Sequence, residues 1–122
     1  MARILVIDDD EQVLEMLYES LTREGYDVLR ASNGEQGMRL YREEPVDLII
    51  TDLIMPEKEG IETIIELRQD FPDVKIIAIS GGGRIGTKDY LNMAKIFGVQ
   101  RTFTKPVARE QLLDAIRGLI NE

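Results

Sequence analysis

Short apolar runs rich in β-branched residues alternate along the chain with longer segments in which apolar residues recur at helical spacing. The runs predict strands at residues 3–8, 26–31, 47–51, 74–79 and 100–104. Several runs, such as residues 4–7 and 76–79, are almost continuously apolar rather than alternating. Continuous runs are typical of strands that are covered on both faces, so the sequence predicts a mostly parallel sheet.

The segments between the runs predict five helices. The apolar positions of the first are Val13, Leu14, Leu17 and Leu21, and those of the third are Ile61, Ile64 and Ile65, with the stem of Arg68. The fourth has Tyr90, Ala94 and Phe97, and the fifth has Leu112, Leu113 and Ile116. The second begins at a capping box made by Asn33 and Gln36. Five strand–helix units in series predict an α/β domain with right-handed crossovers and helices on both faces of the sheet.

Composition narrows the chemistry that this domain can perform. The 122 residues suit one domain, 1–122, and they include no cysteine and no histidine. Disulfides, thiolate zinc sites and the usual general base are therefore excluded. The formal charge of −8 disfavours direct binding to nucleic acid or anionic membranes.

Targeting signals are missing from the sequence. No run approaches the ~18 apolar residues of a membrane span, and the first residues lack the pattern of a signal peptide. We therefore expect a cytoplasmic protein without membrane insertion. The chain ends soon after the fifth predicted helix, so we expect either a stand-alone domain or a part cut from a longer protein.

Polar residues with related chemistry follow four of the predicted strands. They are Asp8, Asp9 and Asp10 after the first strand, Asp52 after the third, Ser80 after the fourth, and Lys105 with Pro106 after the fifth. In open α/β sheets, sites form outside the carboxyl ends of the strands. Carboxylates, a hydroxyl and an ammonium at that edge predict a site for a hard cation and a phosphoryl group.

The acidic residues differ in how strongly they indicate a metal. Adjacent carboxylates such as Asp8 and Asp9 repel one another unless a cation lies between them, and oxygen ligands favour Mg²⁺ or Mn²⁺. Asp10 fits a helix cap as well as it fits a site. Asp52 can be a ligand, a nucleophile or both. Pro106 either begins the last helix or helps to hold Lys105 extended toward the site.

With these residues, the chain resembles the receiver domain of two-component response regulators over essentially its whole length. The acidic pair, the Asp after the third strand, the hydroxyl after the fourth and the Lys-Pro pair follow the family pattern. The stretch from Asp52 to Pro56, with Gly60 four residues on, is highly typical of it. The resemblance implies a flavodoxin-like, doubly wound five-stranded parallel sheet in the order 2-1-3-4-5.

The resemblance also implies roles. Asp52 would be phosphorylated by a histidine kinase or a histidine phosphotransfer protein, and the domain would act as a switch rather than an enzyme, assisting only its own phosphorylation and dephosphorylation. Asp8, Asp9, Asp52 and the backbone carbonyl of Ile54 would hold Mg²⁺. Ser80 and Lys105 would contact the phosphoryl group. An unknown output protein would bind the face formed by residues 86–121.

Three departures from the family pattern stand out. Thr102 occupies the position of an aromatic switch residue, and Phe103 beside it should point to the opposite face of its strand. Ser80 is followed by three glycines, 81–83, in a loop longer than is typical, which is either a harmless insertion or a segment that orders when Ser80 engages the phosphoryl group. Ala108 stands where a Ser or Thr helix cap is common.

Two other functions compete with the phosphorylated switch. Phosphatases of the haloacid dehalogenase type also use a strand-end Asp and Mg²⁺, but residues 8–12 lack the Thr or Val of their motif, and no cap domain is visible. A pseudo-receiver, a binding module that keeps the fold without phosphorylation, would be expected to lose members of a site that is complete here.

Overall fold

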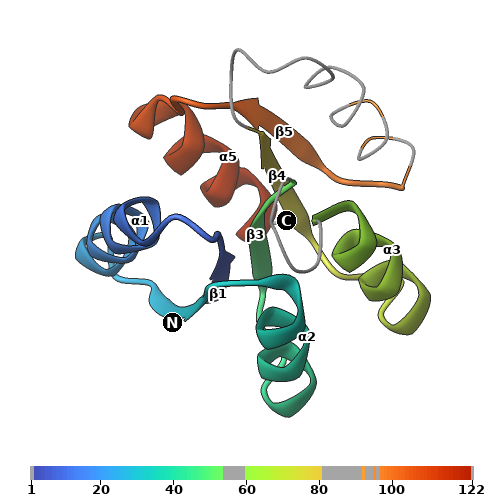
Figure 1. Ribbon diagram of the computed structural model, residues 1–122. Coiled ribbons are helices and arrows are strands. Elements are labelled where there is room, and N and C mark those ends of the chain that lie inside the picture. The colour runs from blue at the N-terminus through green and yellow to red at the C-terminus, as the bar shows by residue number, and fades with distance from the viewer. Residues whose placement is uncertain (1, 54–59, 81–91, 93–94, 96, 122) are drawn as a thin grey trace.

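The computed structural model describes residues 2–53, 60–80, 92, 95 and 97–121 (Figure 1). Five strands, all paired in parallel, form one sheet in the order β2-β1-β3-β4-β5. Their bounds are Arg3–Ile7 (β1), Asp27–Ala31 (β2), Leu48–Asp52 (β3), Ile76–Ser80 (β4) and Arg101–Thr104 (β5). The predicted strands and their order are confirmed, with ends displaced by at most two residues.

Four helices lie within the described residues: α1 (Glu11–Arg23), α2 (Gly34–Glu43), α3 (Gly60–Asp70) and α5 (Arg109–Ile120). The fourth predicted helix, around Tyr90 and Ala94, lies outside the described residues. Phe97, which was expected to belong to it, packs against the core. No helix in the described ranges is both long and apolar enough to cross a membrane.

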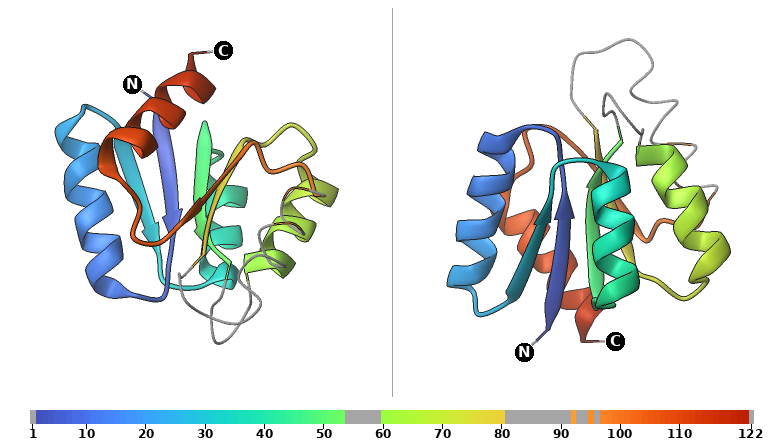
Figure 2. Two further views of the ribbon diagram at one scale, coloured as in Figure 1. Left: turned by 90° about the horizontal axis from the view of Figure 1, so that it is seen from above. Right: turned by 60° about the horizontal axis from the view of Figure 1, so that its bottom comes forward.

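The helices cover both faces of the sheet, as the apolar runs predicted (Figures 1 and 2). Alternate strand residues contribute to two core clusters. Leu5, Ile49 and Ile76 pack with side chains of α2 and α3, whereas Ile4, Ile50 and Ile77 pack with those of α1 and α5. All five residues of β3 and of β4 are buried, because these strands lie inside the sheet.

Helix capping explains where the first two helices begin. Asp10 caps α1, because its Oδ1 accepts hydrogen bonds from the backbone N–H of Gln12 at 2.9 Å and of Val13 at 3.4 Å. Asn33 Oδ1 accepts from Gln36 N–H at 2.8 Å, but the Gln36 side chain returns to Ser32 rather than to Asn33. The predicted capping box is therefore half confirmed.

Two cationic side chains brace the amino-terminal edge of the sheet. Arg68 of α3 donates hydrogen bonds to the carbonyls of Phe97 (3.0 Å), Pro72 (3.0 Å), Gly98 (2.6 Å) and Val74. Burial lowers the pKa of Arg68, and the charge of Asp73 opposes that effect. Lys75, just before β4, donates to the carbonyl of Leu119 near the end of α5.

Candidate functional site

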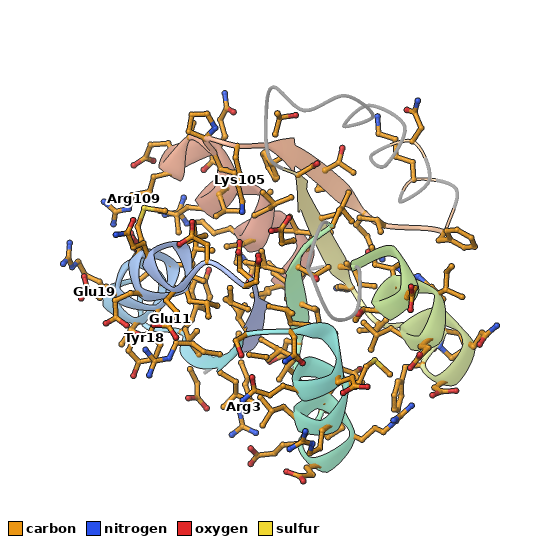
Figure 3. All side chains as sticks on the ribbon, in the orientation of Figure 1. Arg3, Glu11, Tyr18, Glu19, Lys105 and Arg109 are labelled. Atoms are coloured by element: carbon orange, nitrogen blue, oxygen red, sulfur yellow. The ribbon has the colours of Figure 1, made fainter. Side chains whose placement is uncertain are left out.

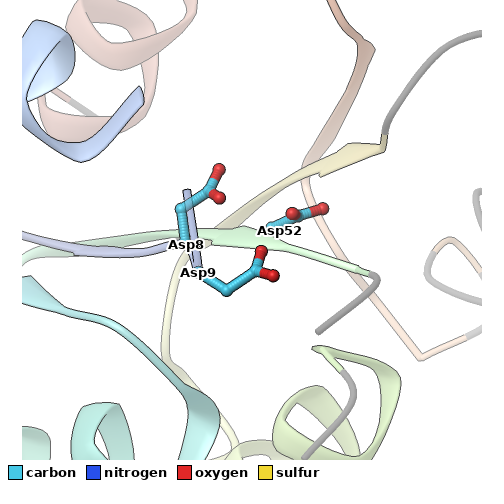
Figure 4. A group of neighbouring side chains, drawn as sticks. All are labelled: Asp8, Asp9 and Asp52. Atoms are coloured by element: carbon cyan, nitrogen blue, oxygen red, sulfur yellow. The ribbon is translucent and has the colours of Figure 1, made fainter. Parts of the chain in front are cut away.

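Three carboxylates converge at the carboxyl edge of the sheet (Figure 4). Asp8 and Asp9 follow β1, and Asp52 ends β3. These strands are neighbours in register, with Ile7 opposite Thr51, so their ends meet. One carboxylate oxygen of each residue lies within 4.8 Å of the others. The predicted cluster of Asp8, Asp9 and Asp52 is therefore present.

The three carboxylates differ in burial. The exposed fraction is 2% for Asp8 and 6% for Asp52, whereas Asp9 is exposed. Burial raises the pKa of Asp8, and the charge of Asp52 adds to the effect. Hydrogen bonds from the Asp10 backbone, at 2.9 Å, and from Lys105 act in the opposite direction without cancelling it. The cluster thus concentrates negative charge where water is scarce.

Lys105 reaches the cluster from the far side of β4. Its backbone N–H donates to the carbonyl of Ser80 at 2.7 Å, which extends the β4–β5 pairing to the end of the sheet. Its Nζ lies 2.9 Å from Asp8 Oδ2 and 3.2 Å from Asp52 Oδ2. Burial lowers the pKa of Lys105, but the hydrogen bonds and charges of the two carboxylates outweigh it, and the net pKa is raised.

Ser80 ends β4 with a fully buried side chain. Its Oγ has no hydrogen-bond partner within the described part of the chain. A buried hydroxyl without a partner is costly, by about 1–3 kcal/mol, and calls for a function. The hydroxyl can serve a ligand oxygen that arrives at the carboxyl edge beside Lys105.

Thr102, at the expected aromatic position, and its neighbour Phe103 lie on opposite faces of β5, as predicted. Thr102 lies opposite Ala78 and Phe103 opposite Ile79. Ala78 and Ile79 belong to different core clusters, and Phe103 packs on the side of α1 and α5. Phe103 therefore does not replace the missing aromatic residue on the Thr102 face.

The other residues that the sequence assigned to the site or to its surroundings lie at different places in the structure. Asp10 lies outside the carboxylate cluster and acts as the cap of α1. Gly60 begins α3. Pro106 does not begin the last helix, because α5 starts at Arg109 after the cap residue Ala108; the Lys105–Pro106 peptide bond is cis. Ile54, Pro56 and glycines 81–83 lie outside the described residues.

The donor set fits a hard divalent cation. Three carboxylates supply only oxygen, which suits Mg²⁺ or Mn²⁺ and not zinc in its usual thiolate and imidazole sites. The sequence did not reveal that Lys105 bridges two of these carboxylates. That contact depends on how far β5 extends beyond β4, which the apolar pattern fixes only to within a few residues.

Comparisons with known proteins agree with this geometry. A family model described as a response regulator receiver domain matches residues 4–117. The transcriptional regulatory protein GlrR of Escherichia coli (strain K12) is 35% identical over 115 residues, which are 94% of this chain and 25% of GlrR. The uncharacterized transcriptional regulatory protein YrkP of Bacillus subtilis (strain 168) is 39% identical over 110 residues, 90% of this chain and 46% of YrkP.

Solved structures are similar over nearly the whole chain. A response regulator receiver domain protein from Clostridium thermocellum has a TM-score of 0.91 at 32% identity and covers 99% of this chain and 95% of its own. A CheY-like receiver domain protein from Methanospirillum hungatei JF-1 has a TM-score of 0.91 at 26% identity, with 99% and 94% covered. The chain therefore matches entire receiver structures but spans only a quarter to a half of GlrR and YrkP.

Proposed function

Because the chain belongs to the family of response regulator receiver domains, we propose that it is a phosphorylation-operated switch whose phosphoacceptor is Asp52. One observation carries the assignment of the site. The Asp52 carboxylate, the Lys105 ammonium and the Ser80 hydroxyl, which has no hydrogen-bond partner among the described residues, lie at one edge of the sheet, where a phosphoryl group needs positioning and positive charge.

The phosphoryl donor would be a histidine kinase or a histidine phosphotransfer protein. An Asp52 oxygen attacks the phosphorus of a phosphohistidine, the P–N bond breaks, and the imidazole leaves with its electron pair. The product is an aspartyl phosphate on Asp52. We propose no other substrate. The domain would therefore act as a switch that assists its own phosphorylation and dephosphorylation, and not as an enzyme with turnover.

Asp8, Asp9 and Asp52 would hold Mg²⁺ or Mn²⁺, and the family pattern adds the backbone carbonyl of Ile54. When bound, the ion supplies positive charge that offsets the cluster and the oxygens of the transferred group. Lys105 contributes the second positive charge. Its Nζ lies 3.2 Å from Asp52 Oδ2, which supports a role for Lys105 beside the proposed phosphoacceptor.

The switch itself follows from contacts that exist only after phosphorylation. Ser80 Oγ donates to one phosphoryl oxygen and Lys105 Nζ pairs with another, so both side chains favour one arrangement of the carboxyl edge. A state is stabilised only by the free energy of contacts that the other state lacks. Thr102 cannot couple this movement to an aromatic ring, so the signal would leave through the backbone of β4 and β5.

The proposed output surface lies within residues 86–121, of which α5 and β5 are described. GlrR and YrkP are named as transcriptional regulators. For this chain we propose a cytoplasmic role that acts through an output protein or domain. The formal charge of −8 favours that role over direct contact with DNA.

Intact-mass measurement tests the proposal. The protein is incubated with acetyl phosphate and Mg²⁺, beside an Asp52→Ala control. A gain of about 80 Da, one phosphoryl group, that needs Mg²⁺ and is lost in the control supports it. No gain, together with no binding of a beryllofluoride mimic, would instead favour a pseudo-receiver. Steady hydrolysis of a phosphomonoester would revive the phosphatase.

The metal assignment has its own test in Asp9→Ala. Removing this exposed carboxylate relieves repulsion in the cluster, so the metal-free melting temperature should rise. The Mg²⁺-dependent increase in melting temperature, which grows as RT ln(1 + [L]/Kd), should vanish. Glu19→Ala is the matched control, because Glu19 is an exposed acid on α1 outside the cluster. If the parent protein melts at the same temperature with and without Mg²⁺, the metal site is refuted.

A further inference from the structure

The buried Asp8 carboxylate receives a hydrogen bond at each of its two oxygens. The backbone N–H of Asp10 donates to Oδ1 at 2.9 Å, and Lys105 Nζ donates to Oδ2 at 2.9 Å. The two donors come from different elements, because Asp10 directly precedes Glu11, the first residue of α1, whereas Lys105 lies in the segment that leads into α5 (Figure 3). The orientation of the Asp8 carboxylate therefore depends on both elements.

The two donors to Asp8 differ in their other duties. Lys105 is shared between Asp8 and Asp52, and under the proposed function it pairs with the phosphoryl group. The Asp10 N–H has no such second partner among the described contacts. When Lys105 turns to the phosphoryl group, the Asp10 N–H is the described donor that still orients the Asp8 side chain.

The cap of α1 holds this N–H in place. Asp10 has extended dihedral angles, φ −87° and ψ 109°, and its side chain accepts hydrogen bonds from the N–H groups of Gln12 and Val13. Its carbonyl accepts from Leu14 N–H at 3.0 Å. A side chain that bonds the backbone two and three residues on restricts the backbone of its own residue. The Asp10 carboxylate therefore helps to hold its own N–H on Asp8.

On the basis of the metal site in the proposed function, we propose that Asp10 is a positioning residue for that site. By capping α1, its carboxylate keeps the Asp10 N–H on Asp8 and so keeps Asp8 oriented toward the cation, although Asp10 itself lies outside the carboxylate cluster. Groups that hydrogen-bond a ligating side chain orient it, and their loss typically lowers metal affinity 10–100-fold. Asp10 acts through its cap geometry and not its charge, so Asn, which caps about equally well, can replace it.

Three variants separate the cap from charge and from stability. Asp10→Ala removes cap and charge, Asp10→Asn removes the charge alone, and Asn33→Ala removes the matching cap of α2, where Asn33 Oδ1 accepts from Gln36 N–H at 2.8 Å. Each protein is titrated with Mg²⁺ at constant ionic strength, well below its melting temperature, and the amide NMR signals of Thr51 and Asp52 give the Kd. Asp10→Ala should bind Mg²⁺ about tenfold more weakly. Asp10→Asn should stay within about threefold of the parent and Asn33→Ala within about twofold.

A second measurement needs no metal. In EDTA, hydrogen exchange at the amide of residue 10, corrected for the intrinsic rate, reports its hydrogen bond to Asp8. Asp10→Ala should accelerate this exchange at least about tenfold, whereas Asp10→Asn should leave it within about threefold. Urea unfolding should show similar losses of stability in Asp10→Ala and Asn33→Ala, so stability alone would not explain a difference in Mg²⁺ affinity.

Four results would overturn the role of Asp10. They are a Mg²⁺ affinity of Asp10→Ala close to that of the parent, an equal loss in Asp10→Asn, an equal loss in Asn33→Ala, and unchanged exchange at residue 10 in Asp10→Ala. If the parent binds Mg²⁺ and one of these results is obtained, the proposed function stands and the role of Asp10 alone is refuted. A parent protein without a saturable Mg²⁺ response would refute the metal site, and the role of Asp10 with it.

Discussion

Replacing Lys105 with methionine should destabilise the metal-free protein. Methionine keeps much of the apolar stem but removes the charge that lies 2.9 Å from Asp8 and 3.2 Å from Asp52. Removing one partner of a buried ion pair costs about 3–5 kcal/mol. The side chain of Lys105 is 24% exposed, and Asp8 can take up a proton, so we expect about 2 kcal/mol.

The cost should depend on pH and on metal. The pKa of Lys105 is raised in the folded protein, so its stabilisation is complete below the pKa of lysine in the unfolded chain. It is lost as the pH rises through the folded-state pKa. The difference between variant and parent should therefore shrink in strong alkali. Saturating Mg²⁺ should at least halve it at neutral pH, because the ion replaces the missing positive charge.

Urea unfolding followed by circular dichroism measures these differences, in EDTA and in Mg²⁺. Lys95→Met is the control, since Lys95 is exposed and makes no ion pair among the described residues. Equal stability of Lys105→Met and the parent in EDTA would contradict the predicted role of the Lys105 charge. An equal loss of stability in Lys95→Met, or a Lys105→Met deficit that Mg²⁺ leaves unchanged, would contradict it as well.

Three further predictions concern stability, each measured by urea unfolding. Gly37→Ala should destabilise by about 1–2 kcal/mol, because its Cβ would overlap the Ile7 side chain, whereas Gly118→Ala, which has open space, should stabilise by about 0.5–1 kcal/mol; similar effects at both sites would contradict this. Arg68→Lys should cost about 2–4 kcal/mol, since an ammonium cannot reach all the carbonyls that the guanidinium bonds; a neutral result would show that water replaces them. Ala108→Ser should add about 1 kcal/mol by capping α5, where no side-chain cap exists; no gain would mean that the hydroxyl points elsewhere.

The sequence predicted the strands well because three of them are buried on both faces. Continuous apolar runs such as residues 76–79 of β4 have few alternatives to a central strand. Asp8, Asp52 and Ser80 could be predicted for the same reason, because each lies at the end of such a run. Asp52 and Ser80 needed only the rule that parallel strands end at a common edge.

Contacts between distant segments could not be predicted in this way. Arg68 was read as a residue whose stem packs on the helix face, yet its guanidinium bonds carbonyls that lie up to 30 residues away in sequence. The bridge from Lys105 to Asp8 joins residues 97 positions apart. Both depend on tertiary register, and a spacing pattern contains no information about it.

The bracing by Arg68 and Lys75 gives the sheet two unlike ends. At the amino-terminal end, the side chains of Arg68 and Lys75 donate hydrogen bonds to backbone carbonyls, far from the carboxylates that would bind metal or phosphate. At the opposite end, Lys105 pairs with the carboxylates of Asp8 and Asp52, which would also bind the proposed metal ion and phosphoryl group. Amide hydrogen exchange should therefore be slow and constant near Val74 and Gly98 in every chemical state of the protein. Only the amides at the carboxyl ends of the same strands should change their exchange rates when metal or phosphate binds. The amides at the amino-terminal ends can then serve as the reference against which those changes are measured.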